Sequence, residues 1–510
     1  MAFLKVKTGL QASLALAALV AASPLLSDVV AKPVQRSMED QFRDPPNSAR
    51  PRVWWHWMNG NITEDGIAKD MAWMKRVGIG GLQNFDANLT TPQIVPNRLV
   101  YMTPGWKHAF KFAANEAERR GLELTIAASP GWSETGGPWV PPEDGLKKLV
   151  WSETLVSGGV PFKGVLASPP MTTGPFQNLV MGKSIDELIA GGNSPEKVRP
   201  KFYADVAVLA FPAEVSPLLN PAKVTRADGA AVNSAALTDA DLNSAVDIEP
   251  GTAKAPATIM FDYGKPQTLR SASLFLPGAS AMFFGATVSP LLEASDDGAK
   301  WRKIADIVAA QVPTTVSFAP VTARYFRAVF APKSGGGMDL VAASAPGVDF
   351  GAFGAGMGAA GKPVLHVGEL RLSTESRIDR FEAKAGYELE LDYYALSEGL
   401  ADTPGTAPGK VINLTDKMRA DGTLDWTPPK GNWRVLRLGS SLLGTENHPA
   451  PKEATGLEVD KFDGQAVRRY MVHYIGMYRD AAGADMVGDK GVRAILTDSI
   501  EVGAANWTPK

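Results

Sequence analysis

The chain of 510 residues contains no cysteine, few histidines and almost no net charge. Without cysteine there are no disulfides and no thiolate metal ligands, so stability must come from burial of apolar side chains. The five histidines, at positions 56, 108, 366, 448 and 473, are scattered without the spacing of a zinc site. A net charge of -2 gives no electrostatic reason to expect binding to nucleic acid or to anionic membranes.

Residues 1–31 have the composition of a secretory signal peptide. Two lysines precede the apolar run Leu14–Ala22, and residues 29–31 offer a small-residue cleavage site. The run is too short and too rich in alanine to favour a membrane span, with an uncleaved anchor as the alternative. We therefore expect a periplasmic or secreted protein whose mature chain has no membrane span.

Tryptophan is concentrated in one part of the sequence. Eight of the 12 tryptophans lie between Arg52 and Trp151, interleaved with acids and amides. Flat aromatic faces suit the C–H faces of a sugar, while acids and amides suit its hydroxyls. The segment therefore predicts a carbohydrate site, and core packing is the alternative for each tryptophan taken singly.

Residues 52–129 predict alternating strands and helices, which implies parallel pairing with right-handed crossovers. Polar and aromatic side chains follow each predicted strand. In a (β/α)8 barrel these positions form the C-terminal mouth, where active sites are assembled. The predicted substrate-binding residues are Trp55, His56, Trp57, Asn59, Asn84, Asp86, Trp132, Glu134, Asp498 and Trp507.

The middle of the chain has a different pattern. Residues 152–370 contain short alternating segments separated by turn residues, which predicts an inserted β-sandwich domain whose spacing resembles the galactose-binding-like jelly rolls. Residues 371–438 form a β-rich connecting segment, and the tract 333–362, rich in glycine and alanine, is expected to be a flexible loop. The barrel pattern, which occupies residues 32–151, returns over 439–510.

Glu501 and Glu458 are the predicted catalytic carboxylates. Glu501 follows a short apolar strand predicted over 492–498, a position that directs a carboxyl group into a barrel mouth. Glycoside cleavage uses two carboxyl groups, about 5–5.5 Å apart for retention and about 6.5–9.5 Å for inversion, and the acid has a raised pKa. The alternatives are a strand-end ion pair with an arginine for Glu501 and surface pairing with Lys461 for Glu458.

Four blocks of sequence are long and unusual: residues 54–61, 78–86, 129–140 and 497–501. The first reads Trp-Trp-His-Trp-Met-Asn-Gly-Asn and the last Thr-Asp-Ser-Ile-Glu. They resemble glycoside hydrolase family 106, a family of α-L-rhamnosidases, and the resemblance extends over most of the chain after the signal peptide. It implies a (β/α)8 catalytic domain interrupted by β-sandwich insertions, and inverting hydrolysis of terminal α-L-rhamnosides with Glu501 as general acid.

The resemblance also implies a bound calcium ion that helps to hold the sugar hydroxyls, with the general base and some calcium ligands on later strands. Calcium prefers about six to eight oxygen ligands. Spacing does not select among the side chains that could supply some of them, namely Asp86, Glu134, Glu458 and Asp498.

The two barrel-like segments hold well below the roughly 250 residues of a complete barrel, with only about five of its strands. The barrel is therefore predicted to be incomplete, in a chain that is shorter than the family's members and is expected to be a fragment. Two other functions stay open: a carbohydrate-binding protein without catalysis, and a glycosidase for another sugar on the same fold.

Overall fold

The computed structural model describes residues 36–89, 91–182, 198–213, 219–281, 285–333, 364–390, 393–397 and 405–508. The predicted signal peptide and residues 334–362 of the predicted flexible loop lie outside these ranges. The chain divides into two compact units, Met1–Arg50 and Pro51–Lys510. In the first, helix α1 (Met38–Arg43) is followed by a short 3-10 turn, Asn47–Ala49. No helix in the described ranges is both long enough and apolar enough to cross a membrane.

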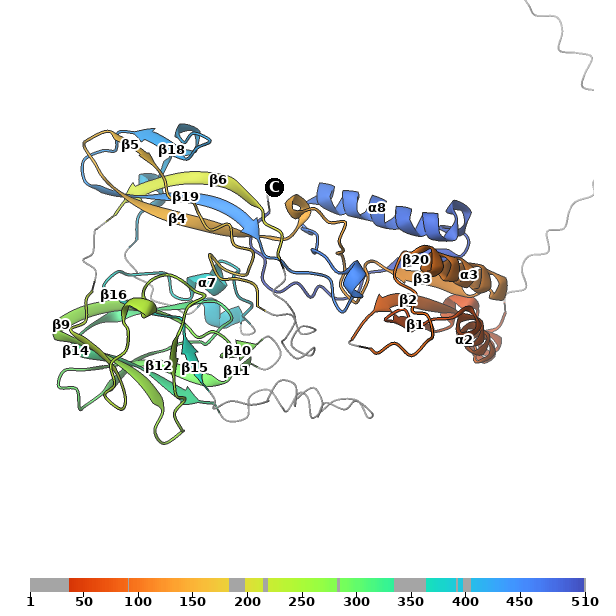
Figure 1. Cartoon of the computed structure of the whole chain (residues 1–510), viewed down its shortest axis with the longest axis horizontal. Helices are drawn as coiled ribbons and strands as arrows, with labels where there is room; N and C mark the ends of the chain where they lie inside the picture. Colours follow the sequence, from red (N-terminus) through yellow and green to blue (C-terminus); the bar gives the residue numbers. More distant parts are fainter. Residues whose placement is uncertain are drawn as a thin grey trace, which may run out of the picture. The chain divides into compact units, whose positions relative to one another are not determined.

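The second unit contains a four-stranded parallel sheet in the order β1-β2-β3-β20 (Figure 1). Its strands are β1 (Arg52–Met58), β2 (Gly81–Ala87), β3 (Glu123–Ala127) and β20 (Val492–Leu496). Helices α2 (Glu64–Arg76) and α3 (Pro104–Arg120) connect the first three strands, and α8 (Gly464–Ala482) precedes the fourth. The predicted alternation of strands and helices and the parallel pairing are confirmed.

The described residues do not form a closed barrel, so the (β/α)8 barrel stays a prediction. The sheet has four parallel strands rather than about five. Residues 457–462, which lead to α8, make only isolated bridges, Glu446 with Leu457 and Gly145 with Val459, and so add no strand. Asp463 then starts α8 by accepting hydrogen bonds from the backbone N–H groups of the helix's first turn.

One face of the parallel sheet packs against α2, α3 and α8 in a common hydrophobic core. The first turn of α3 contributes Trp106, and the helix ends at Gly121, whose φ of 63° is the left-handed conformation that glycine adopts readily. Three tyrosines one turn apart on α8 face this core: Tyr470, Tyr474 and Tyr478.

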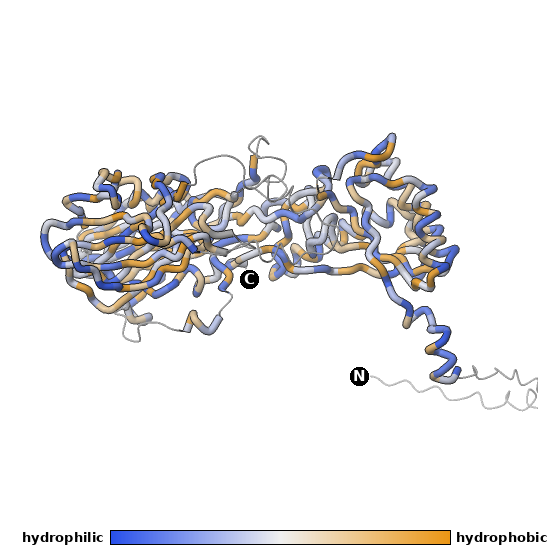
Figure 2. The backbone as a smooth tube through the Cα atoms, turned by 90° about the horizontal axis from the view of Figure 1, so that it is seen from below, coloured by the Kyte–Doolittle hydropathy of each residue, from blue (hydrophilic) through white to orange (hydrophobic). Residues whose placement is uncertain are grey.

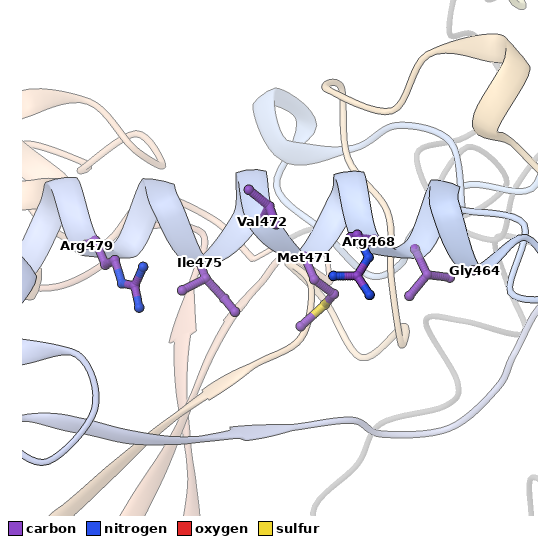
Figure 3. A pocket seen from close by; sticks show the side chains of 7 residues that line it. Gly464, Arg468, Met471, Val472, Ile475 and Arg479 are labelled. Carbon is purple, nitrogen blue, oxygen red and sulfur yellow. The ribbon is translucent and has the colours of Figure 1, made fainter. Parts of the chain in front are cut away.

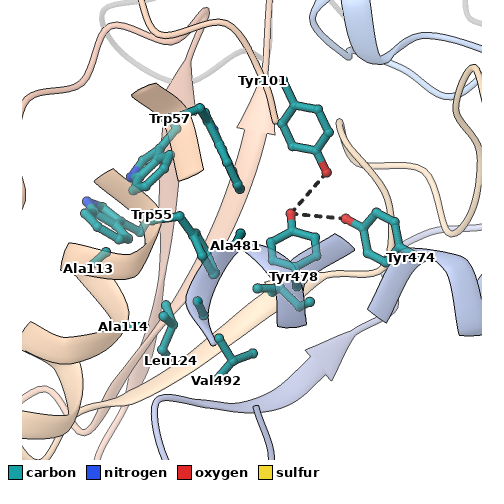
Figure 4. Close-up of a cluster of buried hydrophobic side chains, with 14 of the residues drawn as sticks. Trp55, Trp57, Tyr101, Ala113, Ala114, Leu124, Tyr474, Tyr478, Ala481 and Val492 are labelled. Carbon is teal, nitrogen blue, oxygen red and sulfur yellow. Dashed lines mark hydrogen bonds between the residues drawn. The ribbon is translucent and has the colours of Figure 1, made fainter. Parts of the chain in front are cut away.

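Each of these tyrosine hydroxyls has a polar partner inside the core. The Tyr474 hydroxyl donates to the carbonyl oxygen of Ala127 at 2.9 Å. The Tyr478 hydroxyl lies 3.3 Å from the hydroxyls of both Tyr474 and Tyr101, as Figure 4 shows. The core between α8 and the last residue of β3 is therefore aromatic but contains a connected row of hydroxyl groups.

The inserted residues form two antiparallel sheets. One has the order β13-β12-β14-β9-β16, with β7 also paired to β9. Its strands are β7 (Lys223–Arg226), β9 (Ala257–Phe275), β12 (Val288–Ser295), β13 (Arg302–Asp306), β14 (Thr314–Pro332) and β16 (Glu369–Ser373). The other sheet, in the order β17-β6-β19-β4, consists of β4 (Lys147–Ser157), β6 (Tyr203–Pro212), β17 (Ile412–Asn413) and β19 (Asn432–Leu442).

Smaller elements complete the insertion. Three strand pairs are β5 (Phe162–Val165) with β18 (Thr423–Trp426), β8 (Val246–Ile248) with β15 (Leu365–Val367), and β10 (Ser280–Ala281) with β11 (Gly285–Ala286). A short helix, α7 (Phe381–Lys384), precedes the return to β19. Buried and more exposed residues alternate along parts of β9, β12 and β19, as expected for sheets with one buried face. Figure 2 shows hydrophobic and hydrophilic residues interspersed along the chain. The β-rich character of the insertion is confirmed, and the predicted boundaries after residues 151 and 438 fall inside β4 and β19.

The loop after β3 interlocks with the segment after β19. The backbone N–H of Gly131 donates to the carbonyl of Asp86 at 2.7 Å, and that of Trp132 donates to the carbonyl of His448 at 2.9 Å. Gly131 has a φ of +82°, and a Cβ atom there would lie 2.7 Å from the carbonyl carbon and oxygen of His448. Both the backbone conformation and the close approach therefore require glycine at this position.

Gly131→Ala is expected to lower the free energy of unfolding by about 1–3 kcal/mol or more, because it combines a strained φ with a clash against backbone. Urea denaturation measures the change. Gly464→Ala is the matched control, because a Cβ there meets nothing within 4 Å, and it should be neutral or slightly stabilising. Equal stability of the two variants would contradict the interlock.

Candidate active site

The two sides of the parallel sheet separate the predicted site residues into two groups. In the register of β1 and β2, Trp55 pairs with Asn84 and Trp57 with Asp86, so these four side chains share one side. Because Trp55 and Trp57 belong to the core with the helices, this is the helix-facing side. His56, which alternates with them, lies on the opposite side.

Trp55 and Trp57 are core residues in this structure. The indole N–H of Trp55 donates to Asp70 of α2 at 2.9 Å, and Trp57 packs edge-on against Trp106 with 5.7 Å between ring centroids. They are 7% and 1% exposed, so the packing alternative describes their environment. Asn59, with φ 51°, holds the turn after β1 by accepting a hydrogen bond from Arg98 and donating one to a backbone carbonyl.

Asn84 and Asp86 are buried on the helix-facing side with incomplete hydrogen bonding. The indole N–H of Trp106 donates to Oδ1 of Asp86 at 2.8 Å. Oδ2 of Asp86 and both side-chain polar atoms of Asn84 have no hydrogen-bond partner in the structure. Burial raises the pKa of Asp86 to about 7, the bond from Trp106 opposes the shift, and the charge of Glu453 adds to it. Because Asp86 is the register partner of Trp57, it lies on the opposite side of the sheet from His56.

His56 lies on the other side of the sheet in an aromatic setting that fixes its tautomer. Its ring stacks on Phe85 with 5.1 Å between centroids, and Nε2 accepts a hydrogen bond from the indole N–H of Trp132 at 2.9 Å. Since an indole N–H only donates, the neutral ring carries its hydrogen on Nδ1. Burial lowers the pKa of His56, while the nearby carboxylate of Asp498 acts in the opposite direction. His56 thus offers a neutral N–H donor.

Glu501 is partly exposed beyond the end of β20 and contacts a histidine. Nε2 of His448 lies 3.1 Å from Oε2 of Glu501, and Nδ1 of His448 lies 3.2 Å from the carbonyl oxygen of Glu446. The backbone of His448 is held by Ser133, whose hydroxyl accepts from the His448 N–H at 3.0 Å. The alternative prediction for Glu501 is an ion pair with an arginine. Among the described residues its partner is instead His448.

Glu458 is fully buried and forms an internal ion pair. Oε2 accepts hydrogen bonds from the ammonium of Lys461 at 2.7 Å and from the hydroxyl of Thr135 at 2.6 Å, while Oε1 has no partner. The predicted pairing with Lys461 is present, but it is buried rather than on the surface. Glu134 joins the same group, with Oε2 4.0 Å from the Lys461 ammonium.

The remaining candidates are less closely bound together. The charge of Asp498 is near enough to raise the pKa of His56, against the larger effect of burial. Trp507 forms a backbone bridge with Lys147 at the start of β4. Two hollows occur along α8, of about 470 and 530 Å³. Figure 3 shows the first, lined by side chains such as Met471 and Ile475. Neither hollow is lined by a predicted site residue, so neither coincides with the predicted active site.

His56, Trp132, Glu134 and Glu501 thus lie on or after strands of the parallel sheet, and His448 lies in the segment after the antiparallel strand β19. A sequence model of glycoside hydrolase family 106, described as alpha-L-rhamnosidase, matches residues 43–510. The chain belongs to glycoside hydrolase family 106. The resemblance inferred from the four sequence blocks is confirmed.

Relatives of the family-106 chain are longer than it is. It is similar to the solved rhamnosidase of Novosphingobium sp. PP1Y, with 53% identity and a TM-score of 0.80, over 93% of this chain and 41% of that one. It is 26% identical over 476 residues to a Formosa agariphila protein provisionally named a β-glucuronidase. The matched region covers 93% of this chain and 25% of that protein. The chain therefore spans about two fifths and one quarter of these relatives' lengths.

A chitosan-binding module of a Paenibacillus sp. IK-5 chitosanase/glucanase is also similar, at 15% identity over 30% of this chain and 96% of the module. The TM-score is only 0.21, which is too low to assign a fold. The galactose-binding-like type of the insertion in the family-106 chain stays a prediction.

The four candidate calcium ligands of the family-106 chain do not form one site. Asp86 faces the helices, and Oε2 of Glu458 is bonded to Lys461 and Thr135. Among the residues that the structure describes, no three histidine or acidic side chains converge as a metal site would require. These residues alone do not fit a calcium ion.

Sequence reasoning missed Trp54 and His448. Trp54 is 58% exposed on the same side as His56, with its ring 5.7 Å from the His56 ring. Its position two residues before His56 could have indicated this, because side chains two apart on a strand share a face. No local signal points to the role of His448, because the carboxyl group that it contacts lies 53 positions away and the hydroxyl that holds its backbone lies 315 positions away.

Trp132→Phe is expected to raise the pKa of His56 toward its ordinary value, because the indole donor that opposes protonation of Nε2 is lost. Titration of the histidine ring signals by NMR measures it. Trp139→Phe is the control, since the Trp139 N–H has no hydrogen-bond partner in the structure. An unchanged His56 titration in the Trp132 variant would contradict the assigned tautomer.

Asp86→Asn is expected to flatten the pH dependence of stability. The folded protein holds this proton with a pKa of about 7 against 3.8 as the reference value, so the stability it contributes is full below about pH 4 and is lost as pH rises to 7. The loss is at most on the order of 4 kcal/mol. Urea denaturation at pH 4.5 and 7.5 measures it, with the exposed Asp65→Asn as control; a slope identical to wild type in the Asp86 variant would refute the account.

Proposed function

We propose that this chain acts in the hydrolysis of terminal α-L-rhamnosides, with Glu501 as the general acid, in an exported glycosidase. The observation that carries the proposal is the position of Glu501. It follows a strand of the parallel sheet in the Asp-Ser-Ile-Glu block and contacts His448, whose backbone is bonded to the loop that carries Trp132 and Glu134. Family membership and the 53% identity to a solved rhamnosidase support the sugar class.

The proposed reaction inverts the anomeric centre. Glu501 gives its proton to the glycosidic oxygen as the bond from that oxygen to the anomeric carbon breaks, and water attacks from the opposite face. A second carboxylate takes a proton from the water. His56 is suited to hydrogen-bond a sugar hydroxyl through its Nδ1–H, and Trp54 and Trp132 offer aromatic faces beside it.

Glu458 is a weaker candidate for the second carboxylate than its sequence position suggests. It is fully buried, and its Oε2 accepts from Lys461 and Thr135. We expect it to hold Lys461 in place near Glu134. Calcium binding is also proposed, from family membership alone. The ion would need ligands besides the described acids, which do not form a complete site.

Two alternatives remain distinct. The distant relative with a β-glucuronidase name favours testing a second sugar, because one barrel fold serves many substrates. A protein that binds sugar without cleaving it is the other alternative. A panel of nitrophenyl glycosides that includes the α-L-rhamnoside and the β-glucuronide distinguishes a rhamnosidase from a glycosidase for another sugar. Rhamnose binding without release of nitrophenol would favour a binding protein.

Glu501→Gln is expected to lower kcat for methyl α-L-rhamnoside by about 10²–10⁴-fold, because the methoxide leaving group must be protonated and the amide cannot supply the proton. Rhamnose affinity, measured by calorimetry, should change little, because the amide keeps the size of the side chain. Glu143→Gln, at an exposed acid outside the site, is the control and should leave both quantities unchanged. Full turnover by the Glu501 variant would overturn the assignment.

A further inference from the structure

The contact between His448 and Glu501 has no role in the hydrolysis steps described above. The two residues follow different strands, and Nε2 of His448 lies 3.1 Å from Oε2 of Glu501. We infer that His448 is a positioning residue that binds one carboxyl oxygen of Glu501 and leaves the other to carry the proton given to the substrate. The inference rests on the proposed role of Glu501 as general acid.

The first step is the hydrogen on Nδ1. This nitrogen lies 3.2 Å from the carbonyl oxygen of Glu446, and a carbonyl only accepts. Nδ1 therefore carries a hydrogen. A hydrogen bond between Nε2 and Oε2 then needs one more hydrogen, which comes either from a doubly protonated His448 ring or from a protonated Oε2 of Glu501.

The two arrangements differ in what they leave for the substrate. With the hydrogen on Oε2, the acidic proton of Glu501 is directed at His448 and away from the leaving group. With hydrogens on both nitrogens of His448 and a further proton, taken up from solvent, on Oε1, Oε2 accepts from His448 and Oε1 holds the proton for the glycosidic oxygen. When that proton is transferred and the glycosidic bond breaks, Glu501 becomes a carboxylate that still accepts from the His448 imidazolium.

The backbone of His448 is held in place independently of its side chain. The His448 N–H donates to the hydroxyl of Ser133 at 3.0 Å, and its carbonyl accepts from the N–H of Trp132 at 2.9 Å. Both bonds use backbone atoms, so they survive replacement of the ring. A substitution at His448 therefore removes the contact with Glu501 while it keeps the interlock that holds the loop.

The test compares two rhamnosides that differ in their need for an acid. Methyl α-L-rhamnoside has a poor leaving group that must be protonated, whereas 2,4-dinitrophenyl α-L-rhamnoside has a leaving group that departs without a proton. For the full chain, His448→Ala should lower kcat/KM on the methyl glycoside by about 10–100-fold, as expected for partial loss of general acid catalysis, with a change below about 3-fold on the dinitrophenyl glycoside. His448→Gln, whose side-chain N–H can donate to Oε2, should restore part of the loss.

Equal losses on the two glycosides, or no loss on either, would overturn the inference, because a purely structural role affects both substrates alike. Glu501→Gln separates this failure from failure of the proposed function. If Glu501→Gln shows no selective loss on the methyl glycoside, the acid assignment itself fails. If it does and His448→Ala does not, only the positioning role fails. The double variant should lose no more than Glu501→Gln alone.

A spectroscopic measurement decides the matter even if the chain alone gives no turnover. Ring ¹⁵N signals of the full chain are recorded by NMR, and His448 is assigned by its disappearance in His448→Ala. The inference predicts hydrogens on both ring nitrogens and a shift of the Nε2 signal in Glu501→Gln, where Nε2 faces an amide in place of a carboxyl group. An Nε2 signal that is the same in wild type and Glu501→Gln would refute the contact.

Discussion

The candidate site depends on one constraint, the interlock of the loop after β3 with the segment after β19. Asn447, 1% exposed, is its centre: its amide donates to the carbonyls of Pro130 and Ala454, and its Oδ1 accepts from the N–H of Gly456. A Cβ on Gly136 would lie 2.7 Å from that of Asn447, so the two backbones touch. Buried polar groups satisfied in this way fix a geometry firmly, because an unpaired one is costly.

From this interlock three residues of one loop contact one histidine ring, the backbone of a second histidine and a buried glutamate. Trp132 sets the tautomer of His56, Ser133 holds the backbone of His448, and Thr135 donates to the carboxylate of Glu458. The loop therefore coordinates the protonation and orientation of side chains that lie far apart in the sequence. Such support is what distinguishes a preorganised site from a set of polar residues that share an edge of a sheet.

Much of the local structure follows from the sequence, and much of the site does not. The alternation of strands and helices is written in apolar spacing, and the strand that precedes Glu501 follows from the same pattern. The helix-facing location of Trp55 and Trp57 needs one further fact, namely which side of β1 the helices cover. Because that fact is tertiary, periodicity alone gives the two sides without saying which is buried. The contacts of His448 depend on chain segments that an insertion separates, so no local pattern encodes them.

The insertion does more than interrupt the parallel sheet. β4 leaves the first segment and β19 returns to the second, and the two strands pair from Lys147 with Leu442 to Ser157 with Asn432. The exit and the return of the chain are therefore adjacent, which brings the loop after β3 to the segment after β19. Lys148 strengthens this junction: its buried ammonium donates to the carbonyls of Thr172 and Leu442, and burial lowers its pKa to about 7.

The amine of Lys148 has only carbonyl partners and is costly to bury while charged. We therefore expect its hydrogen bonds to have a structural role. Here they join the last residue of β19 to a loop inside the insertion, one residue from the pairing that opens the antiparallel sheet. The antiparallel sheet thus holds the two segments of the interlock next to each other, and the interlock orients the groups around Glu501. On this reading the β-rich insertion belongs to the construction of the site, although none of the predicted catalytic residues lies in it.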